Sequence, residues 1–202
     1  MKKINMVDLN GQYRKIRWQV NREIKKVINS STFINGPIVK EFQNNLQKYV
    51  DVKHVIPCAN GTDALYIAMM SLGIKAGDEV IVPSITYVAS FQAISATGAV
   101  PVACDIDEDS LCLNWEDAEK RITSKTKAII TVALFGLSPE YDEILEICKE
   151  YGIFLIEDNA ECFLGYYKGK LVGTFGDFSS FSFQASKHIS CGEGGMLTTN
   201  NP

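Results

Sequence analysis

Short apolar runs and longer helix-favouring segments alternate between residues 52 and 158 of this chain. Several runs, such as the one at 128–134, are apolar at nearly every position, which is typical of strands that are buried on both faces of a sheet. Strands that alternate with helices in this way usually lie parallel to one another. The pattern therefore predicts an α/β fold of three layers, in which helices cover both faces of a mostly parallel sheet.

Apolar periodicity and turn residues place the boundaries of the expected elements. The expected strands are 52–58, 79–83, 100–105, 128–134, 154–158, 178–183 and 196–199. The expected helices are 12–29, 37–49, 64–72, 87–97, 115–121 and 139–151. We therefore predict an N-terminal helical segment at residues 1–36 and one large domain at residues 37–202.

Composition excludes several classes of function. The 202 residues are 46% apolar and 22% charged, which is ordinary for a globular fold. A net charge of −4 does not favour binding to nucleic acid, because no basic stripe is present to neutralise phosphates. No apolar run is long enough to cross a membrane, and residues 1–8 do not resemble a secretory signal. We therefore expect a cytoplasmic protein with neither a nucleic-acid nor a membrane partner.

Six cysteines are scattered along the chain without a Cys-x-x-Cys pair: Cys58, Cys104, Cys112, Cys148, Cys162 and Cys191. Structural zinc sites need closely spaced ligand pairs, and neither His54 nor His188 has a partner histidine at helical spacing. We expect no metal site and no disulfide, and we interpret the cysteines as small buried apolar residues.

Polar residues follow several predicted strands, and in an open parallel sheet ligands bind at the carboxyl ends of the strands. The first strand is followed by residues 60–63, Asn-Gly-Thr-Asp, which open a helix. Their amides and the Thr62 hydroxyl could hold a phosphate, although a helix cap formed by Thr62 or Asp63 would explain the same residues. The stretch lacks the Walker pattern, so a P-loop nucleotidase is not supported.

Two further strand ends carry an aromatic ring and carboxylates. Tyr87 follows the strand at 79–83, where its ring would either stack on a planar ligand or belong to the core. Glu157 and Asp158 end another strand, and Glu161 comes three residues after Asp158. An acid at such a place is normally functional or strongly hydrogen-bonded, because burying it unpaired is costly.

Lys187 lies between a Phe-rich strand and a loop with three glycines, at 192, 194 and 195. An amine beside apolar residues loses solvation and becomes a better nucleophile toward carbonyls, although a surface lysine on a loop would also explain the residue. A phosphate anchor, a stacking ring, an acid and a reactive lysine are the four groups that pyridoxal phosphate (PLP) requires. Their occurrence together, in order along the chain, predicts a PLP site.

Six motifs follow one another along the chain, at 35–37, 60–65, 77–84, 126–130, 156–158 and 181–195. With these motifs the sequence, from Val7 onward, resembles the sugar aminotransferases of the DegT/DnrJ/EryC1/StrS family. The resemblance implies that residues 37–202 form an aspartate aminotransferase-like large domain that binds PLP, and that a C-terminal small domain is absent from this chain. It also implies a homodimer, glutamate as the amino donor and a nucleotide-linked keto-sugar as the acceptor.

The same resemblance implies roles for single residues. Lys187 would form the Schiff base with PLP and would carry protons during the reaction, and Asp158 would pair with the pyridinium nitrogen. The other cofactor contacts would come from Gly61, Thr62 and Ser182 at the phosphate, and from Tyr87 and Glu161 at the ring.

Two positions depart from the family pattern. Glu161 stands where the family usually has Gln near the cofactor ring, so a carboxylate is added there. Ala133 stands in a Val-x-x-x-Gly stretch where many members have His, so a polar side chain near the expected active face is removed.

The sequence leaves three functions open. The first is a PLP-dependent sugar aminotransferase, and the second is a related sugar dehydratase in which His replaces the lysine. The third is a truncated relative that keeps the fold without catalysis. Lys187 favours the first function, while the adjacent His188 keeps the second one open.

Overall fold

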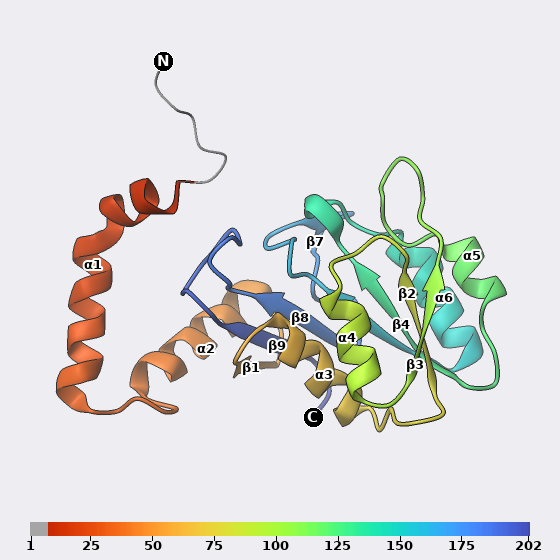
Figure 1. The fold of residues 1–202 in the computed structure, drawn as a ribbon, viewed down its shortest axis with the longest axis horizontal. Helices are drawn as coiled ribbons and strands as arrows, with labels where there is room; N and C mark the ends of the chain where they lie inside the picture. The colour runs from red at the N-terminus through yellow and green to blue at the C-terminus, as the bar shows by residue number, and fades with distance from the viewer. Residues whose placement is uncertain (1–7) are drawn as a thin grey trace, which may run out of the picture. The chain divides into compact units, whose positions relative to one another are not determined.

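A computed structural model describes residues 8–202 of the chain (Figure 1). Two sequence interpretations concern residues outside the described range: the absence of a secretory signal in residues 1–8, of which only residue 8 is described, and the start of the family resemblance at Val7. The chain divides into two compact units, Met1–Asn45 and Leu46–Pro202. This division falls inside helix α2 (Pro37–Val50), whereas the sequence placed a domain boundary after residue 36.

The first unit is dominated by helix α1 (Leu9–Ser30), which begins before its expected start at residue 12. The early start has a local cause, because Oδ1 of Asp8 accepts a hydrogen bond from the Gly11 amide at 2.9 Å. The helix ends where Ser31 adopts a left-handed conformation with φ of 52°. None of the residues of α1 is buried.

The second unit is built on a seven-stranded sheet (Figure 1). In spatial order the strands are β1 (His54–Cys58), β9 (Gly195–Thr199), β8 (Phe178–Ser182), β5 (Phe154–Asp158), β4 (Thr126–Val132), β2 (Glu79–Pro83) and β3 (Val100–Cys104). From β8 to β3 all neighbours are parallel, and only β9 runs antiparallel to the strands beside it, β8 and β1. The expectation of a mostly parallel sheet is thus confirmed.

Two apolar cores lie on opposite faces of this sheet, because successive strand residues point to opposite sides. Val80 and Val82 of β2 pack with α3 (Gly61–Ser71) and α4 (Ala89–Ala96) on one face. Ile81, between them, packs on the other face with α5 (Trp115–Lys120) and α6 (Tyr141–Tyr151). The predicted three-layer α/β fold is therefore confirmed.

Some local features differ from the expectations. Strand β4 ends at Val132 and gives way to a 3-10 turn, Leu134–Gly136, and a two-stranded hairpin of β6 (Tyr166–Tyr167) and β7 (Lys170–Leu171) was not foreseen. Its strands have two residues each, too few to produce a periodic signal. Cys191 was expected to be buried, but it is exposed because it belongs to a loop outside the sheet.

Two further properties of residues 8–202 bear on the classes of site that they can form. All six cysteines are free thiols, and the described residues contain no cluster of three or more His, Cys, Asp or Glu side chains that could hold a metal ion. No helix within this range combines the length and the apolar character that crossing a membrane requires.

Candidate active site

Glu157 and Asp158, the adjacent acids at the end of β5, face opposite sides of the sheet and have different hydrogen-bond partners. Glu157 is fully buried, and its carboxylate accepts hydrogen bonds from the amides of Gly173, Phe175 and Gly176 at 2.7 to 2.8 Å. The Ser179 hydroxyl donates a fourth bond at 2.8 Å. Glu157 therefore fastens the segment that leads into β8, and its hydrogen bonds account for its burial without a ligand.

Asp158 is 6% exposed and lines a pocket on the other face. Its Oδ2 accepts from the Ser90 hydroxyl at 2.9 Å, and its Oδ1 accepts from the Ala160 amide at 3.1 Å. Burial raises the pKa of Asp158, while these donors and the positive charge of Lys187 act to lower it. The carboxylate is thus well hydrogen-bonded, yet desolvated, which favours pairing with a cation.

The turn after β1 presents free amides to the same pocket. Asn60 caps α3, because its side chain accepts from the Asp63 amide at 2.8 Å, so the expected cap by Thr62 or Asp63 is wrong. Within the described part of the chain, the amides of Gly61 and Thr62 have no hydrogen-bond partner. They lie at the positive end of α3, which suits an anion such as a phosphate.

Gly61 also lets this turn approach β8 closely. A Cβ at position 61 would lie 3.0 Å from the Cβ of Ser182, which is tighter than an ordinary contact. The absence of a side chain therefore brings the helix amides and the Ser182 hydroxyl to one corner of the pocket.

Lys187 lies on the loop that joins β8 to β9. The base of this loop is closed by two backbone hydrogen bonds, from the Phe183 amide to the Gly194 carbonyl and from the Cys191 amide to the Phe183 carbonyl. The Lys187 Nζ lies 3.4 Å from Oε1 of Glu161, and the lysine side chain is only 21% exposed. The interpretation as a freely solvated surface lysine is therefore wrong.

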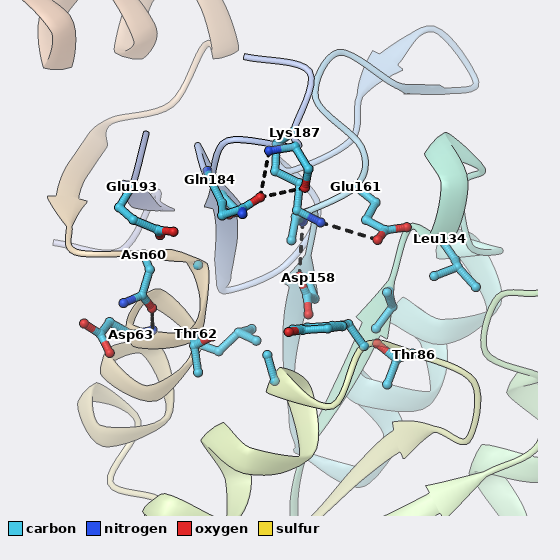
Figure 2. A pocket seen from close by; sticks show the side chains of 18 residues that line it. Asn60, Thr62, Asp63, Thr86, Leu134, Asp158, Glu161, Gln184, Lys187 and Glu193 are labelled. Atoms are coloured by element: carbon cyan, nitrogen blue, oxygen red, sulfur yellow. Dashed lines mark hydrogen bonds and ion pairs between the residues drawn. The ribbon is translucent and has the colours of Figure 1, made fainter. Parts of the chain in front are cut away.

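These elements enclose a pocket of about 640 Å³ at the carboxyl ends of β1, β2, β4, β5 and β8, shown in Figure 2. All seven residues proposed from the sequence line it: Gly61, Thr62, Tyr87, Asp158, Glu161, Ser182 and Lys187. A volume of this size is typical of small-molecule and cofactor sites. The structure thus brings the candidate residues together, while their individual roles remain predictions.

The two interpretations of Tyr87 can be separated, because Tyr87 is 70% exposed and its ring belongs to the pocket wall and not to the core. Other features of the pocket were not anticipated. Ala133 is buried in the core on the face of α6, so the expected change at the active face does not occur there. Its neighbours Val132 and Leu134 line the pocket instead. Thr86, Gln184 and Glu193 also line it, although the sequence had not proposed them as site residues.

The residues present fit PLP on the observations above. The unpartnered amides at the start of α3 offer an anchor for a phosphate, and the desolvated Asp158 offers a partner for a protonated ring nitrogen. The half-buried Lys187 lines the same pocket and supplies an amine to it (Figure 2). These are the donor, acid and amine that the cofactor needs.

Comparison with known proteins gives a consistent picture. The model of the DegT/DnrJ/EryC1/StrS aminotransferase family matches residues 14–202. GDP-perosamine synthase from Escherichia coli O157:H7 is 46% identical over 173 residues, which cover 85% of this chain and 48% of that protein. The chain spans about half the length of the curated relatives it matches.

Solved structures are also similar. The structure of S. venezuelae DesV in complex with a ketimine intermediate has a TM-score of 0.96 and 36% identity, and the match covers 100% of this chain and 55% of DesV. NtdA from Bacillus subtilis, with bound cofactor PMP, has a TM-score of 0.94 at 28% identity, covering 100% of this chain and 46% of NtdA.

Proposed function

The chain belongs to the DegT/DnrJ/EryC1/StrS aminotransferase family, and on this premise we propose that it is the cofactor-binding part of a PLP-dependent sugar aminotransferase. The observation that carries the proposal is the meeting of Lys187, Asp158 and the free amides of Gly61 and Thr62 in one pocket. These groups come from three separate segments of the chain, and a purely structural role would not require them to face a common space.

PLP, when bound, supplies an electron sink for the carbon atom that exchanges its amino group. The chain's own residues hold and orient it. The amides of Gly61 and Thr62 and the Ser182 hydroxyl bind the phosphate, and Asp158 keeps a proton on the ring nitrogen. Tyr87 supports the face of the ring.

Lys187 would provide the amine that holds the cofactor through its aldehyde carbon, and it would move a proton at the reacting carbon. Glu161 lies beside it at 3.4 Å, and Oε2 of the same carboxylate accepts from the Phe135 amide, also at 3.4 Å. Glu161 thus lies within ion-pair distance of Nζ while the lysine is not bound to the cofactor.

The substrates and the assembly belong to the proposal as well. Glutamate is the proposed amino donor. A nucleotide-linked keto-sugar is the proposed acceptor, and the similarity to GDP-perosamine synthase supports this class of acceptor. A homodimer, a cytoplasmic location and a separate C-terminal small domain complete the proposal. The alternatives drawn from the sequence are a sugar dehydratase and a non-catalytic relative. His188 is exposed and does not line the pocket, which favours the aminotransferase over the dehydratase.

The decisive experiment replaces the lysine. In the complete protein, PLP is expected to give an absorbance band that borohydride reduction removes, and Lys187→Ala is expected to abolish both this band and amino transfer from glutamate to a panel of nucleotide-linked keto-sugars. Lys168→Ala is the control, because Lys168 lies in the exposed β6–β7 turn and pairs with Asp142.

A complete protein that stays colourless and binds no PLP after reconstitution would refute the proposal. Deoxygenation of the sugar without amino transfer would identify a dehydratase instead. PLP binding that survives Lys187→Ala with its reducible band intact would show that another amine holds the cofactor.

A further inference from the structure

Ser90 lies in the first turn of α4 and is fully buried. Its hydroxyl donates to Oδ2 of Asp158 at 2.9 Å, across 68 positions of sequence. The hydroxyl of Thr86 lies 3.1 Å from the Ser90 hydroxyl, and Thr86 lines the pocket. Thr86, Ser90 and Asp158 therefore form a hydroxyl relay that runs from the pocket wall to a buried carboxylate.

The number of available protons sets the direction of this hydroxyl relay. A serine hydroxyl has one proton, and an ionised carboxylate can only accept. While Asp158 is ionised, the Ser90 proton points to Asp158, so Ser90 must accept its other hydrogen bond from Thr86. Both hydroxyl dipoles then point along the relay toward the negative charge, and hydrogen bonds to a charge in a buried site are stronger than neutral ones.

The other groups around Asp158 do not duplicate this contact. The Ala160 amide and the Ser180 hydroxyl both donate to Oδ1, at 3.1 and 3.4 Å. The positive charge of Lys187 acts on Asp158 through space. Ser90 thus makes the shortest of the three hydrogen bonds, and it is the one donor to Oδ2 that residues 8–202 provide.

We propose that Ser90 is a positioning residue which, together with Thr86, keeps Asp158 ionised and fixed in orientation toward the nitrogen of bound PLP. This inference rests on the function proposed above, and it deepens that function by assigning a residue that does not itself line the pocket. Ser90 acts through Asp158, because it does not line the pocket and its hydroxyl donates to that carboxylate.

The first test is a pH titration of Asp158 in the PLP-free complete protein, followed by NMR of labelled aspartate carboxyl carbons. Ser90→Ala is expected to raise the titration midpoint by about one pH unit, because a hydrogen bond to a buried charge is lost. Ser90→Cys is expected to shift the midpoint in the same direction, since a thiol fills the space but donates only weakly. Thr86→Ser keeps the hydroxyl and is expected to titrate as the wild type does.

Ser179→Ala is the matched control. Ser179 is also a buried serine that donates to a buried carboxylate, at 2.8 Å, but its partner is Glu157 on the opposite face of the same strand. This variant loses a comparable hydrogen bond and is expected to leave the Asp158 midpoint unchanged. An equal shift in Ser179→Ala and Ser90→Ala would indicate general loosening of the sheet and would overturn the inference.

The second test measures the equilibrium affinity for PLP by absorbance. Ser90→Ala and Ser90→Cys are expected to bind PLP about tenfold more weakly than Ser179→Ala does. A wild-type midpoint and affinity in both Ser90 variants would overturn the role of Ser90. If the wild-type protein binds no PLP, the proposed function fails, while the titration without PLP still decides whether Ser90 holds Asp158 ionised.

Discussion

The hydrogen bonds of Glu157 allow the loss of stability in a Glu157→Gln variant to be predicted. Its Oε1 accepts three hydrogen bonds, from the Phe175 and Gly176 amides and the Ser179 hydroxyl, and its Oε2 accepts one from the Gly173 amide. Glu157→Gln keeps the shape of the side chain. Its carbonyl oxygen can take the place of Oε1, but its amide group then points at the Gly173 amide, so two donors face each other in a buried place.

The expected cost is the sum of two effects. One hydrogen bond to a charged acceptor is lost, at about 1.5–3 kcal/mol, and a buried donor is left unsatisfied, at about 1–3 kcal/mol. We therefore expect Glu157→Gln to lower the free energy of unfolding by about 2.5–6 kcal/mol, a large share of the roughly 5–15 kcal/mol that is typical of a folded domain.

Urea unfolding measures this effect, provided that the slope of the transition is the same in both proteins. Glu161→Gln is the matched control, because it makes the same chemical change at a carboxylate that is 30% exposed and lies 3.4 Å from its partner. Its expected effect is below about 1 kcal/mol. If Glu157→Gln also costs less than about 1 kcal/mol, the four hydrogen bonds do not fasten the segment before β8, and the reasoning fails.

Two further predictions concern the pocket wall. Burial raises the pKa of Asp158 above its ordinary value of 3.8, so ionisation of this group in the folded, PLP-free protein costs stability as pH rises above that value. Asp158→Asn removes this cost while abolishing PLP binding, so in urea unfolding the wild type should lose stability relative to the variant as the pH rises above 3.8. Identical pH profiles of the two proteins would contradict this sign. In Gly195→Ala, the added Cβ would lie 2.9 Å from the Cα of Asn60 and closer still to its carbonyl group. Because the obstacle is backbone, we expect a loss of more than about 3 kcal/mol in thermal unfolding together with weaker PLP binding, and a variant of wild-type stability would show that the turn can move.

Much of the fold could be predicted from the sequence because the relevant signals are local. Val80, Ile81 and Val82 form a run that is apolar on both sides, and such a run stays buried only between two layers of helices. The same holds for the candidate site, because the turn at residues 60–63 and the acid at Asp158 lie directly after strands, where parallel sheets bind ligands.

Other features could not be predicted, because they depend on residues far apart in sequence. Asn60, and not Asp63, caps α3, because its backbone is extended and its side chain accepts from the Asp63 amide, whereas the cap propensities of Asn and Asp are too similar to decide between them. The buried Ser90 carries no local pattern that separates it from any serine on a helix. Ala133 stands at a position of the family pattern that was expected near the active face, yet the turn after β4 directs its side chain to the core.

The sequence by itself determined the α/β class, the kind of residues at the strand ends and the family to which the chain belongs, because each of these depends on short-range pattern and motif order. Only the tertiary structure decided that β9 inserts antiparallel between β1 and β8, that Asp158 and not Glu157 faces the pocket, and that Ser90 reaches Asp158. The physical reason is that strand order and burial are set by hydrogen bonds and packing between distant segments, and these also decide which of two adjacent carboxylates meets a ligand and which one holds the fold together.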